Sequence, residues 1–296
     1  MVETSREAKA EILIIGASGL VGGALLERLG PRAAGTSRAG RSGLLPLDIT
    51  DREAVARTIE RLAPRAVVLA AALTAVDECE RDPERSRLVN AEAPRQVAEA
   101  CRRAGARLVF FSSDYVFGEG GPHSPDDEPA PLNVYGRHKL EAERAIATAI
   151  AGALIVRTCN VYGYAPAGKN FAMSVLRAAR CGQRLRVAAD QFGNPTAAGD
   201  LAAAVVRLLE AGASGIVHLA GSDYVDRATW ARRTAEAFGL DPSFIEPVPA
   251  AALGQAARRP LRAGLDARST CERFGLVMRG LDEGLAAMRE AARQRT

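Results

Sequence analysis

The sequence predicts an α/β protein built on a doubly wound parallel sheet, and three observations lead to this fold class. Short apolar runs of the buried-strand type, such as Glu11–Ile15, Ala66–Ala72 and Arg107–Phe111, alternate with helical stretches. Such continuous runs are typical of parallel strands that are covered by helices on both sides. A glycine-rich turn follows the first run and leads into a helix, as in Rossmann-type dinucleotide-binding folds.

The first turn has the form of a phosphate-binding loop. Small residues let the backbone approach a pyrophosphate, and the helix expected over Gly23–Leu29 would present its N-terminal N–H groups. The spacing is G-x-x-G-x-x-G rather than the G-x-G-x-x-G of ordinary dinucleotide dehydrogenases, and the alternative is a tight turn with nothing bound. The expected cofactor contacts here are Gly16, Ser18, Gly19, Leu20, Val21 and Gly22.

The second strand is expected at about Arg32–Thr36, and it ends without the acidic residue that usually binds the ribose of NAD. Ser37 and Arg38 stand there instead, and Arg41 follows. A guanidinium group suits a 2′-phosphate, so this stretch favours NADP(H) over NAD(H). The alternative is that both arginines are merely solvated.

The next elements continue the alternation of strand and helix. Asp51–Leu62 is expected to be a helix, Ala66–Ala72 the third strand, and Pro83–Arg103 helical. The small side chains at the end of the third strand leave room for a cofactor to lie across the sheet edge. The expected cofactor contacts in this part of the chain are Asp48, Ile49, Ala70, Ala71, Ala72 and Thr74.

The fourth strand, Arg107–Phe111, delivers Ser113 at its carboxyl end, where ligands of open α/β sheets bind. A serine there can hydrogen-bond the same substrate oxygen as Tyr135, further along the chain. The alternative role for Ser113 is a helix or turn cap. The following loop, Gly118–Asn133, is rich in Gly, Pro and acidic residues, which is typical of a lid or binding loop.

Tyr135 and Lys139 lie one turn apart on a helix expected over Val134–Ala151. An ammonium group beside a phenol stabilises the phenolate, so the tyrosine would exchange its proton nearer neutral pH. The chain has 39 Lys+Arg but only three lysines, so a lysine at this position is informative. The alternative is an accidental pair on the helix surface, because Y-x-x-x-K alone is a weak signal.

The pattern loosens after the fifth strand, Ala153–Arg157. Residues 1–163 are expected to form the dinucleotide-binding core, with later strands returning to it at about 185–220. Residues 164–296 are expected to form mainly a smaller, partly discontinuous substrate-binding lobe. The later elements expected are Asn170–Cys181, Leu185–Val187, Gly199–Ala211, Ile216–Leu219, Arg227–Phe238, Ala250–Arg258 and Leu281–Arg293.

Composition argues against several other classes of protein. A net charge of +4 with interspersed signs gives no case for nucleic acid or an anionic membrane as a partner, and the apolar runs are too short to span a bilayer. Residues 1–10 lack the apolar segment of a signal peptide. The five scattered cysteines indicate reduced thiols, and the three histidines have no ligand-like spacing. We therefore expect a cytoplasmic protein without a metal site.

An ordered set of motifs runs along residues 11–220. Its pieces are Gly16–Gly22, Asp48–Asp51, Ala71–Asp77, Val89–Ala91, Ser112–Phe117, Pro131–Lys139 with Glu143, Arg157–Thr158, Val161–Gly163, Asn170–Phe171 and Asp190–Thr196. With these pieces the chain resembles the extended short-chain dehydrogenase/reductases, and within them the dTDP-4-dehydrorhamnose reductase family of sugar-nucleotide 4-ketoreductases. No single piece is specific for the family, but the ordered set is.

The resemblance implies an enzyme of dTDP-rhamnose and other carbohydrate biosynthesis. It implies hydride transfer from NADPH, with NADH as a substitute, to the ketone of a nucleotide-linked 4-keto-6-deoxy sugar. By the same resemblance Tyr135 donates the proton, Lys139 holds the nicotinamide ribose and tunes the tyrosine, and Ser113 orients the keto oxygen. The implied substrate contacts are Val76, Ser113, Asp114, Tyr115, Asn160 and Asn170. The expected assembly is a monomer or homodimer.

Two departures from the family pattern concern the substrate. Where the rhamnose reductases typically carry Trp-Val-Tyr-Gly, this chain has Asn160 before Val-Tyr-Gly, so an amide replaces a stacking surface of the sugar-nucleotide pocket. The only tryptophan, Trp230, is expected to pack in the core elsewhere. Tyr115 occupies the place where the 4,6-dehydratases carry a glutamate, after Asp114, which argues against dehydration.

Two other functions fit the sequence. One is a reductase or epimerase of another keto-sugar or small carbonyl compound on the same fold. The other is a non-catalytic regulatory subunit that resembles the one of methionine adenosyltransferase, but the complete set of Ser113, Tyr135 and Lys139 counts against it. Three further arginines of the C-terminal lobe could reach a diphosphate, the alternative being a solvated surface. They are Arg258, Arg259 and Arg262.

Overall fold

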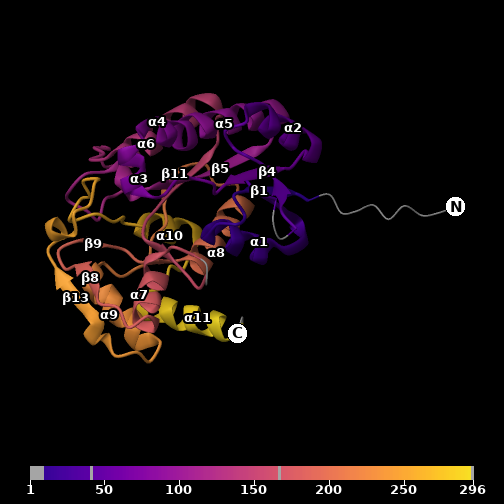
Figure 1. The fold of residues 1–296 in the computed structure, drawn as a ribbon. Helices are drawn as coiled ribbons and strands as arrows, with labels where there is room; N and C mark the ends of the chain where they lie inside the picture. Colours follow the sequence, from indigo (N-terminus) through magenta and orange to yellow (C-terminus); the bar gives the residue numbers. More distant parts are fainter. Residues whose placement is uncertain (1–9, 41–42, 166–167, 295–296) are drawn as a thin grey trace.

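A seven-stranded parallel sheet forms the centre of the computed structural model, which describes residues 10–40, 43–165 and 168–294 (Figure 1). Strand order reverses between β1 and β4, and every neighbouring pair runs parallel. This topology confirms the doubly wound fold class. In spatial order the strands are β11 (Gly215–His218), β6 (Leu154–Thr158), β5 (Arg107–Ser113), β4 (Ala66–Leu69), β1 (Ile12–Ile15), β2 (Ala33–Ser37) and β3 (Leu45–Pro46).

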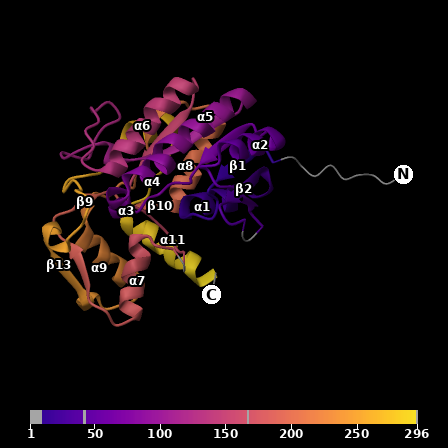
Figure 2. The same cartoon turned by 45° about the horizontal axis from the view of Figure 1, so that its top comes forward.

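Helices cover both faces of this sheet (Figure 2). One face packs against α1 and α8, and the opposite face packs against α2, α5 and α6. Four of them, α1, α8, α2 and α6, lie close to their predicted bounds, whereas α5 is only the last part of a longer predicted helix. The five helices are α1 (Leu20–Leu29), α8 (Ala198–Glu210), α2 (Arg52–Leu62), α5 (Ala93–Ala104) and α6 (Val134–Ala149).

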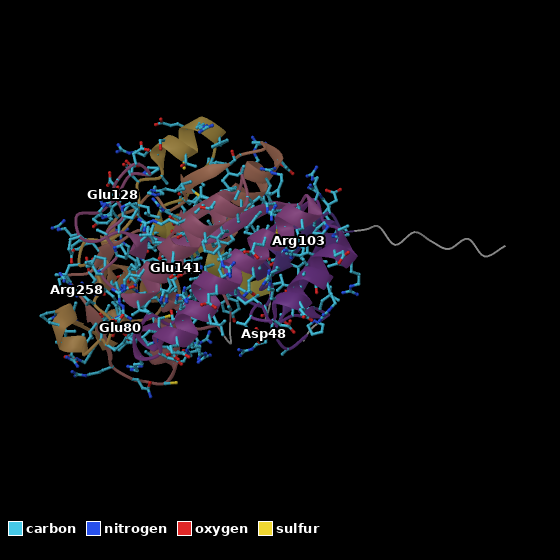
Figure 3. The ribbon with its side chains drawn as sticks, turned by 90° about the horizontal axis from the view of Figure 1, so that it is seen from above. Asp48, Glu80, Arg103, Glu128, Glu141 and Arg258 are labelled. Carbon is cyan, nitrogen blue, oxygen red and sulfur yellow. The ribbon has the colours of Figure 1, made fainter. Side chains whose placement is uncertain are left out.

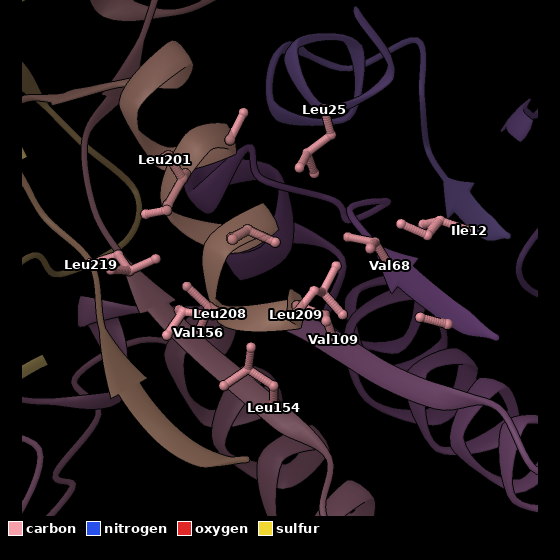
Figure 4. Packing of buried hydrophobic residues seen from close by; sticks show 14 of the residues in the cluster. Ile12, Leu25, Val68, Val109, Leu154, Val156, Leu201, Leu208, Leu209 and Leu219 are labelled. Atoms are coloured by element: carbon pink, nitrogen blue, oxygen red, sulfur yellow. The ribbon is translucent and has the colours of Figure 1, made fainter. Parts of the chain in front are cut away.

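The side chains of β1 show how the sheet is buried on both faces. Ile12 and Ile14 join the cluster under α1 and α8, whereas Leu13 and Ile15 join the cluster under α2, α5 and α6. Successive residues of a strand point to opposite faces, so an apolar residue is needed at every position. Figure 4 shows the first cluster, in which Leu25 and the leucines of α8 meet the strand side chains.

The helical stretch expected over Pro83–Arg103 is divided into three pieces. The first is α4 (Pro83–Arg87), the second is a π-helical turn, η2 (Leu88–Glu92), and the third is α5. A further short helix, α3 (Val76–Arg81), precedes them. The π-helical turn carries Asn90, whose side chain is fully buried. Widened turns of this kind are frequent at functional sites.

The second lobe is formed by later segments that pack on one another (Figure 1). Its core contains Trp230, whose ring lies 4.6 Å from the Phe171 ring and 5.6 Å from the Tyr162 ring, centroid to centroid. The remaining helices and strands are α7 (Phe171–Arg180), α9 (Arg227–Ala237), α10 (Arg268–Phe274), α11 (Leu281–Gln294), β7 (Val161–Tyr162), β8 (Leu185–Ala188), β9 (Phe192–Gly193), β10 (Thr196–Ala197), β12 (Val225–Asp226) and β13 (Ile245–Val248).

Two expectations about the second half of the chain are wrong. Of the later strands, β11 joins the central sheet beside β6, but β8 pairs with β13 instead. The helix expected over Ala250–Arg258 is only a 3-10 turn, η5 (Ala250–Leu253). Gly254 then takes a left-handed conformation, with φ of +60°, and the chain continues without helix.

The irregular segment 254–266, called the strap here, is tied to the loop 118–133. The Glu119 carboxylate accepts hydrogen bonds from the backbone N–H groups of Leu261 and Arg262, at 3.0 and 3.1 Å. The backbone of His123 donates to Gly264 O at 3.0 Å and accepts from Asp266 N at 2.7 Å. The loop expected to be a lid or binding loop is therefore joined to the second lobe.

Candidate active site

The first turn of α6 is fixed from three sides. Asn133 Oδ1 accepts a hydrogen bond from Gly136 N at 2.8 Å, and Asn133 Nδ2 donates to Arg258 O at 2.9 Å. Glu80 Oε2 accepts from Val134 N at 3.0 Å. Figure 3 shows Glu80 and Arg258, which are far apart in the sequence, on the same side of the molecule. These capping bonds set the direction in which Tyr135 points.

Gly136 allows α6 to approach the end of β5. A Cβ atom at this position would lie 1.9 Å from Tyr115 O, so no other residue fits without a backbone shift. The approach brings Tyr135 beside Tyr115, with the ring centroids 6.3 Å apart and the rings at 86°. Tyr135 itself is 8% exposed.

Ser113 lies at the carboxyl end of β5 and makes several contacts. Its Oγ accepts a hydrogen bond from Tyr115 N at 3.1 Å and donates to Asp114 Oδ1 at 3.0 Å. Ser113 also lies near enough to Tyr135 to lower the pKa of the phenol, against the larger effect of burial. Ser113 therefore caps the turn η3 (Asp114–Val116) and lies on the side of the sheet edge from which Tyr135 approaches.

Lys139 lies one turn beyond Tyr135 and is 2% exposed. Its ammonium group lies 4.0 Å from the centre of the Phe110 ring. Burial lowers the pKa of Lys139 to about 7, and the charge of Glu143 acts in the opposite direction. Glu143 is itself held by Arg157, through hydrogen bonds of 3.0 and 2.7 Å. The lysine thus lies between an aromatic ring and a buried ion pair.

The pKa of Tyr135 moves in the direction opposite to the expectation. Burial raises it above its ordinary value, and the negative charge of Asp114 raises it further. The helical spacing predicted the neighbouring Lys139, but not the loss of water around the phenol, which dominates. Tyr135 is therefore fully protonated at neutral pH, which is the form that can donate a proton.

Asp114 is a buried carboxyl group, 5% exposed. Burial raises its pKa to about 6, although the hydrogen bond from Ser113 and the charge of Arg227 lower it. Tyr115 is also buried enough for its pKa to rise, again against the charge of Arg227. Both residues face the second lobe, because Arg227 begins α9.

The glycine turn, residues 16–22, is compact and leaves the start of α1 open. Gly16 has φ of +93°, and a Cβ atom there would lie 2.6 Å from Ala71 N. The N-cap residue Gly19 provides no side-chain cap for α1, and Ser18 is exposed. Free N–H groups at a helix start suit a phosphate, so the residues present fit the pyrophosphate of a dinucleotide.

The end of β2 carries Ser37, whose buried hydroxyl has no hydrogen-bond partner among the described residues. Arg38 is exposed, and its charge lowers the pKa of Asp48, although hydrogen bonds from Thr50 are the main cause of that shift. Ile49 is 8% exposed. Arg41, the other arginine proposed for a 2′-phosphate, lies outside the described residues.

The backbone after β4 is held against the glycine turn by Asn90. Its Oδ1 accepts from Leu73 N, and its Nδ2 donates to Leu73 O, each at 3.0 Å. Ala70 and Ala71 donate their N–H groups to Ile15 O, at 2.9 and 3.0 Å. The stretch from Ala70 to Thr74, with Ala72 in it, therefore borders the glycine turn. Sequence reasoning had noted Asn90 only as part of a motif.

A pocket opens between the end of β5 and the second lobe, and it is called the substrate-side pocket here. Asn160, which was expected near the substrate, lies in it, and so does Trp230, which also packs in the core as expected. Its other polar residues, Arg227 and Gln191, were not among the substrate contacts expected from the sequence. The pocket is lined by Asp114, Tyr115, Asn160, Gln191, Phe192, Gly193, Val225, Arg227, Trp230, Pro260 and Ala263.

Two residues that were expected to contact the substrate, Asn170 and Val76, make other contacts in the structure. Asn170 caps α7, since its Oδ1 accepts from Met173 N at 3.2 Å, and its Nδ2 donates to Gly163 O at 2.9 Å. Val76 packs beside Tyr135 in a small apolar cluster. Neither residue lines the substrate-side pocket.

The three arginines of the strap have separate surroundings. Arg259 Nη1 pairs with Asp77 Oδ1 at 2.9 Å and thereby links the strap to α3. The Arg262 guanidinium lies 5.4 Å from the centre of the Phe192 ring, and Arg258 is exposed. In the part of the chain that the structure describes, no group of three His, Cys, Asp or Glu residues could hold a metal ion. Over the same residues, no helix has the length and apolar character needed to cross a membrane.

The chain is similar in sequence and structure to dTDP-4-dehydrorhamnose reductases. Residues 10–294 match the family model described as the RmlD substrate binding domain. The dTDP-4-dehydrorhamnose reductase of Mycobacterium tuberculosis is 37% identical over 271 residues, which cover 87% of this chain and 85% of the relative. That of Escherichia coli is 36% identical, covering 94% of this chain and 96% of the relative. The crystal structure of dTDP-4-dehydrorhamnose reductase from Bacillus anthracis in complex with NADP gives a TM-score of 0.87 at 28% identity, covering 96% of this chain and 99% of that chain.

Proposed function

The chain belongs to the RmlD substrate binding domain family, and we propose that it reduces the ketone of a nucleotide-linked 4-keto-6-deoxy sugar with NADPH. One observation carries the proposal. Ser113 and Tyr135 both lie buried at the carboxyl end of β5, near enough for Ser113 to lower the pKa of Tyr135, and Lys139 lies buried one turn further along α6. The glycine turn and the substrate-side pocket border the same edge of the sheet, where an enzyme that transfers hydride must bind its cofactor and its substrate next to each other.

Tyr135 is the proposed proton donor. Since burial keeps its phenol protonated, it can give its proton to the alkoxide that forms from the ketone. The hydroxyl of Ser113 would bind the same oxygen and stabilise the developing charge. Lys139 would bind the ribose next to the nicotinamide and place a positive charge near the phenol. When bound, the reduced nicotinamide supplies the hydride.

We propose that the cofactor lies across the carboxyl ends of β1, β2 and β4. The residues 16–22 and the open start of α1 would hold the pyrophosphate. The unpaired hydroxyl of Ser37 and the exposed Arg38 would hold the 2′-phosphate of NADPH, and Asp48 with Ile49 the adenine. Residues 1–163 would thus carry the cofactor and residues 164–296 most of the substrate site.

A reducing compartment, such as the cytoplasm, is the proposed location. The cysteines of this chain are all free, including the exposed Cys181. The regulatory-subunit alternative is not favoured, because Ser113, Tyr135 and Lys139 are all present and all buried. A monomer or homodimer stays a prediction that sedimentation would test.

The test is NADPH oxidation with a panel of nucleotide-linked 4-keto sugars, for wild type and Tyr135→Phe. We expect the variant to bind NADPH normally but to turn over slower by a factor on the order of 10² or more, because it lacks the general acid. Arg137→Gln, an exposed change on the same helix, is the matched control. Unchanged turnover in Tyr135→Phe would remove this residue from the mechanism.

A further inference from the structure

The substrate-side pocket contains a polar pair that the proposed reduction does not itself require. Asn160 Oδ1 accepts a hydrogen bond of 2.9 Å from Arg227 Nη2, although the two residues are 67 positions apart. Asn160 has φ of +48°, a left-handed conformation that asparagine adopts more readily than most residues. A Cβ atom on Gly193 would lie 2.5 Å from Asn160 Nδ2, so the glycine makes room for the amide.

Arg227 is held in place from behind by aromatic rings. Its Cζ atom lies 5.0 Å from the centre of the Phe171 ring and 5.7 Å from that of Trp230. Its backbone N donates to Gln191 O at 3.0 Å. A guanidinium group has five N–H donors in a rigid plane, more than its hydrogen bond to Asn160 uses. Arg227 therefore offers free donors at a fixed position in the pocket.

The pocket also offers an acceptor. Asp114 is buried, and its carboxylate directly follows Ser113 in the chain. Its pKa of about 6 leaves it mostly ionised at pH 7, so its charge offsets that of Arg227 within the pocket. A neutral hydroxyl group can accept from the guanidinium and donate to the carboxylate. A second carboxylate would satisfy Arg227 but would be repelled by Asp114.

The position of Asp114 also indicates which hydroxyl group fits. Ser113 and Tyr135 mark the place of the ketone oxygen in the proposed reaction. Because Ser113 Oγ donates a hydrogen bond to Asp114 Oδ1 at 3.0 Å, a group between Asp114 and Arg227 would lie close to the reacting carbon. In a 4-keto-6-deoxy sugar, C3 is the neighbouring carbon that bears a hydroxyl group, whereas C5 bears the methyl group.

We propose that Arg227, Asn160 and Asp114 bind the C3 hydroxyl group of the sugar and thereby select substrates that carry it. This inference rests on the proposed function, since it concerns the substrate of the same reductase. Binding by stacking on an aromatic ring would tolerate a substrate that lacks this hydroxyl group. A guanidinium and an amide that lose their hydrogen-bond partner would bind such a substrate much more weakly. Sites built to bind a substrate hydroxyl reject the analogue that lacks it much more strongly than apolar pockets do.

The experiment compares kcat/KM for two nucleotide-linked 4-keto-6-deoxy sugars that differ only in the C3 hydroxyl group. We expect wild type to prefer the hydroxylated sugar by a factor on the order of 10² or more. Arg227→Gln should lose most of this preference, mainly through a lower kcat/KM for the hydroxylated sugar. Arg227→Lys, which keeps the charge but not the planar fork, should be intermediate. The matched control is Arg232→Gln, an exposed arginine on α9, which should keep the full preference.

The outcomes separate this inference from the proposed function. Equal reduction of both sugars by wild type, or an equal loss for both sugars in Arg227→Gln, overturns the inference and leaves the reductase function standing. Preference for an analogue with a carboxylate in place of that hydroxyl group overturns it as well. If wild type reduces neither these sugars nor any other of the panel, the proposed function fails and the inference fails with it. Thermal unfolding of each variant distinguishes lost recognition from lost folding.

Discussion

Glu143→Gln removes the negative charge from a buried ion pair on the inner side of α6. The Glu143 carboxylate accepts hydrogen bonds from Arg157 Nε at 3.0 Å and from Nη2 at 2.7 Å, and both side chains are 3% exposed. Arg157 Nη1 has no hydrogen-bond partner among the described residues. The variant therefore leaves a guanidinium group buried without a neighbouring opposite charge.

The expected loss of stability is large. Removing one partner of a buried ion pair lowers the free energy of unfolding by about 3–5 kcal/mol. Because glutamine keeps the shape of the side chain and one hydrogen-bond acceptor, we expect Glu143→Gln to lose about 3 kcal/mol. In large domains, 1 kcal/mol corresponds to roughly 2–4 °C in Tm. We therefore expect the Tm of Glu143→Gln to fall by roughly 6–12 °C.

Thermal unfolding followed by circular dichroism measures this loss. The matched control is Glu141→Gln on the same helix, where the exposed pair with Arg87, at 2.9 Å, should contribute no more than about 1 kcal/mol. The double variant Glu143→Met with Arg157→Met should recover most of the stability, because no charge is then left buried. If the Tm of Glu143→Gln and that of Glu141→Gln agree within about 2 °C, the reasoning from burial is refuted.

The same substitution should also change the pH dependence of turnover. The charge of Glu143 opposes the effect of burial on Lys139, so its loss lowers the pKa of Lys139 below about 7. If the ammonium form is the active one, the basic limb of the kcat/KM profile moves to lower pH. An unshifted profile in a folded variant would mean that Glu143 acts on stability alone.

Two further predictions concern the cofactor and the buried lysine. Arg38→Ala should weaken NADPH binding by roughly tenfold, as the loss of one charge-assisted bond would, and leave NADH unchanged in fluorescence titrations. Equal weakening of both cofactors would contradict the assignment, and Arg28→Ala on α1 is the exposed control. Between pH 7 and 9 the free energy of unfolding of the cofactor-free protein should rise relative to Lys139→Met, by up to about 1.4 kcal/mol per pH unit. The unfolded chain keeps the lysine proton up to 10.5, whereas the folded protein loses it at about 7. Urea unfolding at each pH tests this, and parallel curves would rule it out.

The sequence predicted the parallel core well because that part of the fold is locally encoded. Every residue of β1 is apolar since both faces are covered, and the glycine turn follows it directly. Segments in the second lobe are specified by distant contacts instead. The pairing of β8 with β13 joins residues 60 positions apart, and Asp77 holds the strap through Ala257 N and Arg259. Periodicity in a short window carries no information on such partners.

The placement of Tyr135 and Lys139 on one helix was predictable from the sequence, but the electrostatics of the two groups was not. The helical spacing placed Tyr135 and Lys139 on one face of α6, as the structure does. It suggested that the ammonium group would dominate the pKa of the phenol. Both groups are buried, however, and burial shifts both pKa values toward the neutral form, upward for Tyr135 and downward for Lys139. The balance between burial and neighbouring charge depends on how α6 packs on β5, and a sequence motif does not specify that packing.

Asn160 illustrates the same limit in the substrate-side pocket. On the sequence alone, an amide in place of tryptophan is the loss of a stacking surface. In the structure it is one half of a pair, because Arg227 approaches it from α9. Aromatic rings are still present, because the Phe171 and Trp230 rings lie 5.0 and 5.7 Å from the guanidinium carbon, and Trp230 also lines the pocket. Under the proposed recognition of the substrate, directed hydrogen bonds from Arg227 and Asn160 take the place of stacking, while the residues proposed for proton transfer stay at the end of β5 and in the first turns of α6.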